Sequence, residues 1–494
     1  MARLLAFLLA ALCCLSGQAA AESSSLPAAV LQALKTAGIP PQAVAILVQP
    51  LDAAQPVLRH QATMPMNPAS LMKLLTTLAA LEILGPAYTW RTEALAVGSS
   101  ENGVLAGDLY LRGSGDPKFT YDRLWLLLRE LRGRGLREIR GDLILDGSAF
   151  APVEHDPALF DGKPLRPYNV GPDALLFNFA TLHLTLWPDE KAGGVIKVLG
   201  EPLPASFEII NRLQASDATQ CGEWRERLEA KLTPTQVILS GAFPRVCGEK
   251  RWHLAGLPNA TLLHGVFTRL WRELGGQFSG QVKTGVAPPL ATSLASSESA
   301  PLGELVRDIN KYSNNVMARQ VFLTLGAGPS QASVPPVGGS EPGLRARGAI
   351  KVGAGETAAA ELAIKQWLAQ KSLDFPELVI DNGAGLSRRA RISAANLARL
   401  LATGWTSPVM PEYLASLPIA AIDGTVKKKF NGNGFAGQAH LKTGSLEGVR
   451  GIAGYLTDQH GQRHLVVFMV NHPKASEAQP AFDALLEWLW QGRS

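Results

Sequence analysis

The sequence predicts an α/β protein with more than one domain. Its 494 residues exceed the roughly 250–300 residues at which a single hydrophobic core stops growing. Apolar residues at helical spacing dominate residues 25–88 and return after residue 264, whereas short strand patterns separated by turns fill residues 91–264. With 46% hydrophobic and 18% charged residues, the composition is that of a packed protein rather than a disordered one.

The first 21 residues are typical of a cleavable signal peptide. Arg3 supplies a positive charge, residues 4–15 are apolar, and residues 19–21 form an A-x-A cleavage site. A membrane-spanning helix is disfavoured because the apolar stretch is shorter than the roughly 20 residues that a span needs. Lipid attachment at Cys13 is disfavoured because the bulky Leu12 precedes it. We therefore expect a periplasmic protein without a transmembrane segment in the mature chain, and peripheral contact with the membrane stays open.

Two of the four cysteines lie in the predicted signal peptide, which leaves Cys221 and Cys247. In an exported chain two cysteines can pair, so we expect a disulfide between them. Such a bridge would stabilise the fold by about 3 kcal/mol on the chain-entropy model. The alternative is a pair of buried free thiols.

Individual segments are predicted from their apolar patterns. Residues 107–111 and 141–145 share a Gly-Asp pair followed by apolar residues, which indicates a weak internal repeat of β units. Residues 326–348 are rich in Gly, Pro and Ser and are expected to form a loop. The predicted strands are residues 43–49, 182–187, 194–199, 236–240, 440–443, 451–456 and 464–471, and the predicted helices are residues 266–274, 302–325, 362–370 and 481–490.

The segment Asn67–Lys73 carries the first candidate catalytic pair. Asn67 is a favourable N-cap residue and Pro68 suits the first helical position, so a helix is predicted to begin here. Ser70 and Lys73 then share a face in its first turn, where the helix dipole favours negative charge. A lysine whose pKa is lowered by burial can take the serine proton. Taken alone the pair is weak evidence, because an ordinary helix with a surface lysine gives the same pattern.

Two later motifs complete a three-part set. Serine β-lactamases and penicillin-binding proteins combine S-x-x-K with S-x-N and K-T-G, and Ser313–Asn315 and Lys442–Gly444 follow in that order. Second copies occur at Ser100–Asn102, in a polar turn, and at Lys283–Gly285, soon followed by two prolines that a central strand excludes. The favoured copies have better surroundings, because one precedes a helical pattern and the other lies in a strand pattern.

Each motif residue has a predicted chemical role. Ser70 attacks a carbonyl carbon, and Lys73 accepts the serine proton. Ser313 relays a proton to the leaving amine, and Asn315 holds Lys73 and an amide of the substrate. Lys442 completes the predicted catalytic set.

The strand around Lys442 is predicted to bind the substrate. Lys442 and Thr443 bind a carboxylate, and Thr443, Gly444 and Ser445 lie on a strand whose edge can pair with the substrate backbone. The backbone N–H groups of Ser70 and Ser445 form the oxyanion hole.

The composition argues against two other classes of partner. The net charge of +5 comes without a dense run of Lys and Arg or an aromatic-basic stripe, so no nucleic acid is expected. None of the nine His belongs to an H-E-x-x-H motif or lies with Cys or carboxylates at ligand spacing, so no metal and no other cofactor is expected.

With these motifs the chain resembles the class C low-molecular-mass penicillin-binding proteins, the D-alanyl-D-alanine carboxypeptidase/endopeptidase family. The resemblance implies a penicillin-recognising serine transferase/β-lactamase-like domain, an antiparallel sheet flanked by helices, with a large mostly-β insert. That domain would comprise residues 22–90 and 265–494, and the insert residues 91–264, in two subdomains. The matching stretches are residues 68–73, 310–319, 381–388, 421–425 and 441–454, with residues 107–117 and 141–150 resembling the family's insert.

The resemblance also implies the substrate and the inhibitors. The expected activity is D-Ala-D-Ala carboxypeptidase action on peptidoglycan stem peptides through an acyl-enzyme on Ser70, with β-lactam antibiotics as inhibitors. Endopeptidase action on cross-links stays open, and the alternatives are a β-lactamase or esterase on the same scaffold and a non-catalytic peptidoglycan-binding or antibiotic-sensing module. Ala384 stands where the family commonly has Ser, so its side chain is assigned no role.

Overall fold

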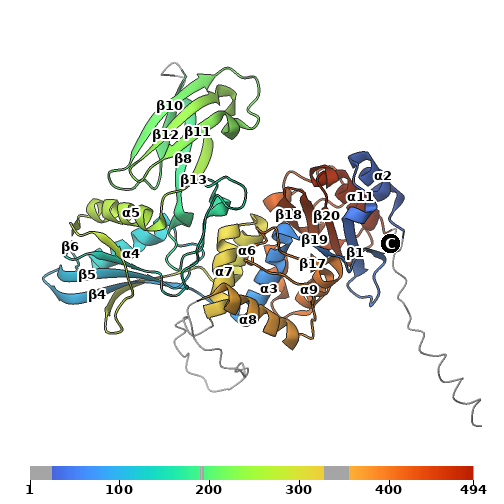
Figure 1. Ribbon diagram of the computed structural model, residues 1–494, viewed down its shortest axis with the longest axis horizontal. Coiled ribbons are helices and arrows are strands. Elements are labelled where there is room, and N and C mark those ends of the chain that lie inside the picture. The colour runs from blue at the N-terminus through green and yellow to red at the C-terminus, as the bar shows by residue number, and fades with distance from the viewer. Residues whose placement is uncertain (1–24, 190, 192–193, 328–354, 493–494) are drawn as a thin grey trace, which may run out of the picture.

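The computed structural model describes residues 25–189, 191, 194–327 and 355–492, and Figure 1 shows their arrangement. The predicted signal peptide lies outside the described residues, as does most of the predicted loop at residues 326–348. Its first two residues, Gly326 and Ala327, instead end helix α7. No helix in the described part of the chain is long and apolar enough to cross a membrane.

A five-stranded antiparallel sheet forms the body that joins the two ends of the chain. The strand order is β18-β19-β20-β1-β2, so the first strands of the chain pair with its last ones. Valine, isoleucine and leucine fill the central strands and favour this structure. The strands are β1 (Val44–Pro50), β2 (Leu58–His60), β18 (Ala439–Leu446), β19 (Val449–Thr457) and β20 (Arg463–Asn471).

Helices cover both faces of this sheet (Figure 1). Alternating residues of β20 divide between two cores: Val466 and Phe468 pack with the terminal helices, whereas Val467 and Met469 pack with the remaining helices. The terminal helices are α2 (Ala28–Ala37) and α11 (Gln479–Trp490). On the other face are α3 (Met72–Ile83), α6 (Leu302–Lys311), α7 (Asn315–Ala327), α8 (Thr357–Gln370), α9 (Ala394–Thr406) and α10 (Met410–Ser416). The predicted antiparallel sheet flanked by helices is therefore confirmed.

The middle of the chain forms a second body with its own hydrophobic core. Its seven-stranded sheet consists of β4 (Arg91–Glu101), β5 (Val104–Gly113), β6 (Glu138–Ile139), β7 (Leu143–Asp146), β14 (Gln277–Phe278), β15 (Val282–Thr284) and β16 (Thr292–Glu298), with α4 (Tyr121–Gly133) and α5 (Asn259–Glu273) beside it. Two three-stranded sheets contain β8 (Thr181–Asp189), β9 (Val195–Gly200) and β13 (Lys250–Ala255), and β10 (Glu208–Ser216), β11 (Leu228–Leu232) and β12 (Gln236–Pro244).

Trp90 and Ser299 mark where the chain passes between the two bodies. The Ser299 backbone N–H donates to the Trp90 carbonyl at 2.9 Å, and the Ser299 hydroxyl accepts from the Trp90 N–H at 3.0 Å. The boundary predicted at residue 264 falls within α5, whose buried face packs in the core of the insert. We propose instead that the insert ends near Ser299; its division into two subdomains stays a prediction.

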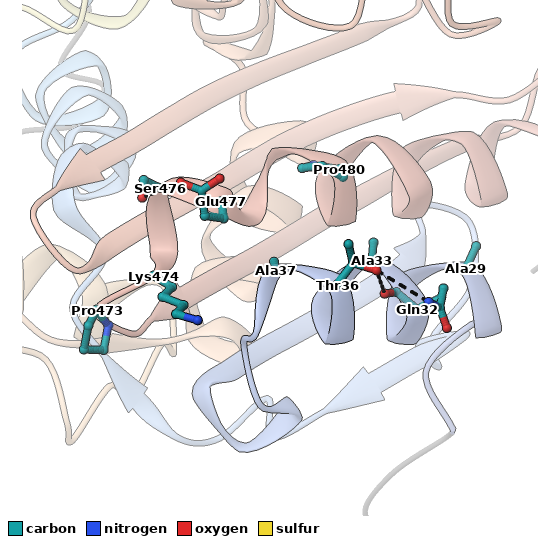
Figure 2. A pocket seen from close by; sticks show the side chains of 10 residues that line it. All are labelled: Ala29, Gln32, Ala33, Thr36, Ala37, Pro473, Lys474, Ser476, Glu477 and Pro480. Atoms are coloured by element: carbon teal, nitrogen blue, oxygen red, sulfur yellow. Dashed lines mark hydrogen bonds between the residues drawn. The ribbon is translucent and has the colours of Figure 1, made fainter.

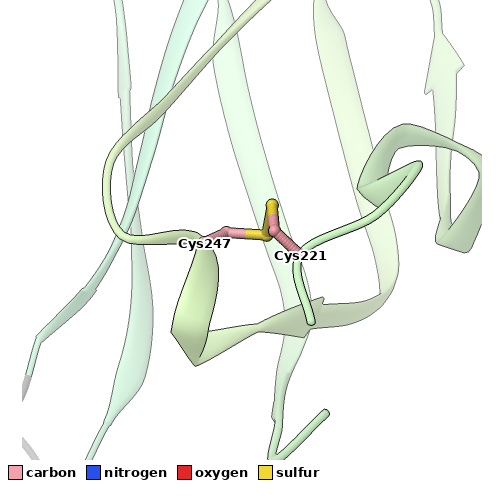
Figure 3. The surroundings of a disulfide bond; sticks show 2 residues. All are labelled: Cys221 and Cys247. Carbon is pink, nitrogen blue, oxygen red and sulfur yellow. A yellow bond between two sulfur atoms is a disulfide. The ribbon is translucent and has the colours of Figure 1, made fainter. Parts of the chain in front are cut away.

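Cys221 and Cys247 form a disulfide in the insert, shown in Figure 3. Cys247 lies in a short 3₁₀ turn after β12, and Cys221 lies in the connection between β10 and β11. The bridge therefore fastens the loops at one end of this small sheet.

Two sequence predictions differ from the structure in detail. The helix predicted at residues 302–325 is two helices, because α6 ends at Lys311 and α7 begins at Asn315. The predicted β repeat corresponds to β5 and β7, which pair in parallel with Leu109 opposite Leu143. Gly107, predicted as a turn residue, lies inside β5. A glycine is required there because a Cβ would be only 2.0 Å from the Val97 carbonyl oxygen.

Candidate active site

The backbone before Ser70 is fixed by one asparagine. Asn67 accepts a hydrogen bond from the Ala69 backbone N–H at 2.9 Å and donates to the Ser387 carbonyl at 2.8 Å. Ala69 adopts a left-handed φ of 47°, a strained conformation for a residue with a side chain. Ser70 therefore lies in a 3₁₀ turn, η2 (Ala69–Leu71), and not in the α-helix predicted from Pro68; the α-helix α3 follows from residue 72.

Lys73 is fully buried and contacts Ser70 directly. Its Nζ lies 3.0 Å from Ser70 Oγ, 2.6 Å from Asn315 Oδ1 and 2.6 Å from the Ala384 carbonyl. Burial, reinforced by the positive charges of Lys442 and Arg319, holds the pKa of Lys73 well below its ordinary value. A buried lysine with a lowered pKa is poised to act as a proton acceptor.

Ser313 and Asn315 lie at the junction of α6 and α7. Ser313 has a left-handed φ of 55°, which ends one helix and turns the chain into the next. The Asn314 side chain then accepts from the Met317 backbone N–H at 3.1 Å, as an N-cap residue does. This sharp junction carries Ser313 toward Lys442 and Asn315 toward Lys73.

Lys442 connects the third motif to the second. It is buried on β18, and its Nζ donates to Ser313 Oγ and to the Thr443 carbonyl, both at 2.8 Å. Burial, with the nearby charge of Lys429, lowers the pKa of Lys442 to about 7. Each of the two buried lysines is thus hydrogen-bonded to one of the two motif serines.

The rest of the third motif brings the backbone of β18 against Ser70. A Cβ on Gly444 would lie 2.5 Å from the Pro68 carbonyl, so only glycine permits this approach. Thr443 is 8% exposed, and its hydroxyl lies 2.8 Å from the hydroxyl of Thr425. Ser445 follows on the same strand and is exposed. All eight predicted site residues therefore lie on the turn η2, the start of α3, the α6–α7 junction and the strand β18, which meet here.

A cavity of about 530 Å³, here called the Ser313 cavity, opens beside Ser313 and extends to the insert. It is lined by Arg166, Arg225, His183 and His253, and none of the described lining residues is acidic. Burial and the neighbouring His253 lower the pKa of His183 to about 4.

A second cavity, of about 640 Å³, is lined by residues of both charges. Arg388 stacks on the Phe160 ring at 4.9 Å there, and Asp381 and Asp156 supply acidic groups. By contrast, the groove of about 780 Å³ between α2 and the segment from Pro473 to Pro480 contains none of the predicted site residues (Figure 2).

Three contributions to the site were not predicted from the sequence. The Ala384 carbonyl accepts from Lys73 although the Ala384 side chain was assigned no role. Arg319, buried on α7, adds positive charge near Lys73. Thr425 belongs to the matching stretch 421–425 but was given no role. A backbone carbonyl has no sequence signature, so only the matching stretch 381–388 indicated that this segment belongs to the site.

The second copies of the motifs lie away from this site. Lys283 is on β15 and forms an exposed ion pair with Asp142. Ser100 and Asn102 lie at the β4–β5 hairpin. The fold, with a buried lysine hydrogen-bonded to a partly exposed serine, is that of a serine peptidase of the penicillin-recognising class.

Comparison with known proteins agrees with this assignment to the penicillin-recognising serine peptidases. The D-Ala-D-Ala carboxypeptidase 3 (S13) family model matches residues 26–335 and 344–491, so the chain belongs to that family. D-alanyl-D-alanine carboxypeptidase DacB of Haemophilus influenzae is 25% identical over 419 residues, covering 82% of this chain and 80% of that protein. The D-alanyl-D-alanine carboxypeptidase of Actinomadura sp. (strain R39) is 26% identical over 434 residues, covering 83% and 74%.

A solved structure shares the fold. The crystal structure of penicillin-binding protein 4 (dacB) from Haemophilus influenzae superposes with a TM-score of 0.71 at 22% identity, covering 93% of this chain and 99% of that chain. The fold and the family predicted from the sequence are thus confirmed.

Proposed function

We propose that this serine peptidase is a periplasmic D-Ala-D-Ala carboxypeptidase that cleaves peptidoglycan stem peptides through an acyl-enzyme on Ser70. Membership of the carboxypeptidase family supports the reaction. The names of its relatives as D-alanyl-D-alanine carboxypeptidases support the substrate. Export through the predicted signal peptide would bring the chain to that substrate, and β-lactams would acylate the same serine.

The hydrogen bonds made by Lys73 Nζ are the observation that best supports the proposal. A neutral amine has two N–H donors and one lone pair. The Asn315 amide oxygen and the Ala384 carbonyl, each 2.6 Å from Nζ, take the two N–H groups. The lone pair is then left for the hydroxyl proton of Ser70, 3.0 Å away. These contacts supply an oriented base whose lowered pKa leaves it free to accept the proton.

In the acylation step, Ser70 Oγ forms a bond to the carbonyl carbon of the penultimate D-Ala while its proton passes to Lys73. The backbone N–H groups of Ser70 and Ser445 hold the oxyanion. When the C–N bond breaks, the leaving amine takes a proton from Ser313, which regains one through its contact with Lys442. In deacylation the water oxygen forms a bond to the acyl carbon and its proton passes through Ser313 to Lys442, while Lys73 returns its proton to Ser70 Oγ as the ester C–O bond breaks.

Lys442 and Thr443 would bind the terminal carboxylate of the substrate. Lys442 is buried and positively charged below about pH 7, and Thr443 is the next residue on β18. Asn315 would also hold an amide of the stem peptide. A carboxylate between the amine and the hydroxyl would place the scissile bond beside Ser70.

The Ser313 cavity favours endopeptidase action as a second activity. Because Ser313 would protonate the leaving amine, the leaving group must emerge on its side. The cavity there, about 530 Å³, is far larger than a single D-Ala needs. Its arginine side chains, Arg166 and Arg225, suit the carboxylates of a second stem peptide.

One assay tests the activity and ranks the alternatives. The protein is incubated with a pentapeptide ending in D-Ala-D-Ala and with a cross-linked muropeptide dimer, and free D-Ala and monomer are quantified. We expect D-Ala from the first and monomer from the second, and neither from Ser70→Ala. If neither product forms while penicillin is hydrolysed steadily, the chain is a β-lactamase instead. If neither product nor acylation occurs, it is a binding or sensing module.

A further inference from the structure

The segment between α10 and β18 follows the edge of the strand that carries the third motif. The Leu441 backbone N–H donates to the Pro418 carbonyl at 2.8 Å, and the Ala420 N–H donates to the Ala439 carbonyl at 2.9 Å. Ile419 forms an isolated β-bridge with His440. The segment is therefore held in register with β18 immediately before Lys442.

This register brings Thr425 to Thr443. In the structure the Thr443 hydroxyl donates to the Thr425 hydroxyl at 2.8 Å, and Thr425 is the middle residue of the short turn η9 (Gly424–Val426). Each hydroxyl has one proton to donate. If the bond reverses when substrate binds, so that Thr425 donates to Thr443, the proton of Thr443 is left for another acceptor. That acceptor would be the substrate carboxylate, so Thr425 can set the direction in which Thr443 donates.

An ion pair between a buried lysine and a partly buried aspartate connects the same segment to the second motif. Lys311, only two residues before Ser313, is 4% exposed. Its Nζ lies 2.5 Å from Asp423 Oδ2 and donates to the Leu417 carbonyl at 3.0 Å. Asp423 Oδ1 accepts from the Ile419 backbone N–H at 2.8 Å. Partial burial acts to raise the pKa of Asp423, but the hydrogen bond from Lys311 holds it below its ordinary value.

Gly424 allows the turn η9 to lie directly against the end of α6. Its φ is +57°, and a Cβ on it would lie 2.6 Å from the Lys311 carbonyl. The turn between Asp423 and Thr425 thus rests on the end of α6, the helix that leads into Ser313. Lys311, Asp423 and Thr425 form a second connection between the two motifs, separate from the direct contact of Lys442 with Ser313.

We propose that Thr425 is a positioning residue that orients the Thr443 hydroxyl toward the terminal carboxylate of the substrate, and that the Lys311–Asp423 ion pair holds Thr425 in place. The proposal rests on the proposed function, because it assigns the carboxylate to Thr443. It predicts an effect on binding of carboxylate-bearing substrates and not on chemistry at Ser70.

Two substrates that differ only in that carboxylate test it. N-acyl-D-alanyl thioesters of thioglycolate and of thioglycolate methyl ester release a thiol that can be followed directly. Thr425→Val removes the hydroxyl at nearly constant shape. We expect KM for the thioglycolate substrate to rise about tenfold with kcat little changed, because a hydrogen bond to a charged group is weakened. Kinetics on the methyl ester should stay within about twofold of wild type, and Thr425→Ser should restore wild-type behaviour.

The ion pair is tested with Asp423→Asn, which keeps the shape and removes the charge. We expect the same carboxylate-selective rise in KM, and little further rise in the double variant with Thr425→Val, since both act through one hydroxyl. Ile422→Ala, an exposed neighbour in the same segment, should behave as wild type.

If Thr425→Val lowers kcat/KM equally on the two thioesters, or changes neither, the proposal is overturned. A rise in KM for the thioglycolate substrate alone in Ile422→Ala would also overturn it. If the increases in KM of Asp423→Asn and Thr425→Val multiply in the double variant, the ion pair does not act through Thr425. Failure of the proposed function would look different, because the wild-type enzyme would then release no D-Ala from the D-Ala-D-Ala pentapeptide.

Discussion

Lys442 Nζ donates to Ser313 Oγ at 2.8 Å, which joins two motifs that lie 129 residues apart in the chain. Lys73 makes the corresponding contact with Asn315, two residues further on. Two buried lysines therefore hold one helix junction from two sides. The activity of the site should depend on the charge that each lysine carries, and the two lysines are expected to act in opposite protonation states.

The pH dependence of substrate capture tests Lys442. Its pKa of about 7 means that the free enzyme carries the positive charge below that pH and loses it as pH rises. We expect kcat/KM for a carboxylate-bearing substrate to fall above about pH 7, because kcat/KM reports the free enzyme. Lys442→Arg keeps the charge at all accessible pH values and should abolish this fall. A fall that persists in Lys442→Arg would assign it to another group.

Asn315→Asp tests the electrostatics of Lys73. A carboxylate in place of the amide, 2.6 Å from Nζ, favours the charged lysine and raises its pKa. On the thioester methyl ester, which does not use the charge of Lys442, we expect kcat/KM at neutral pH to drop by at least about tenfold, with activity recovering as pH rises. Asn315→Ala removes the same acceptor without adding charge, so its pH profile should show no upward shift of the acidic limb. Identical profiles for the two variants would contradict this account.

Gly444→Ala tests the close approach of β18 to the nucleophile. The added Cβ would lie 2.5 Å from the Pro68 carbonyl, so the strand or the turn before Ser70 must move. A misplacement of about 1 Å in a reacting group costs on the order of 10²-fold in rate, and we expect a loss of that size in the acylation rate. Gly133→Ala, where a Cβ meets no atom within 4 Å, is the matched control and should acylate at the wild-type rate.

The disulfide should stabilise the insert without taking part in the chemistry. Cys221 and Cys247 are 26 residues apart, and a bridge across such a loop contributes about 3 kcal/mol on the chain-entropy model. Replacing both cysteines by Ala should lower the melting temperature measured by circular dichroism. The acylation rate at 20 °C should stay near wild type, and a large loss of that rate in a folded variant would contradict the separation.

The three motifs could be predicted from the sequence because each combines fixed residue types with a local pattern. The spacing of Ser70 and Lys73 already places them on one face, and the 3.0 Å contact follows from it. The pairing of Lys73 with Asn315 spans 242 residues, and only the resemblance to a known motif set indicated it. The β18–β19–β20 meander and α11 were also predicted, since alternation and helical spacing are strong there.

What could not be predicted depends on tertiary structure. The left-handed conformations of Ala69 and Ser313 are imposed by their surroundings, since neither residue type favours them. For this reason the predicted helices at Pro68 and across residues 302–325 were wrong in detail. The roles of the Ala384 carbonyl and of Thr425 depend on which segments the fold places beside one another.

The central claim is that Ser70 is the nucleophile, and one experiment tests it most directly. The mature protein is incubated with a penicillin, digested, and mapped by mass spectrometry. The account predicts one penicilloyl adduct on the peptide that contains Ser70 and none anywhere in Ser70→Ala, whose folding is verified by its unchanged melting temperature. An adduct that persists in Ser70→Ala, or that maps to another serine of the wild-type protein, would contradict it.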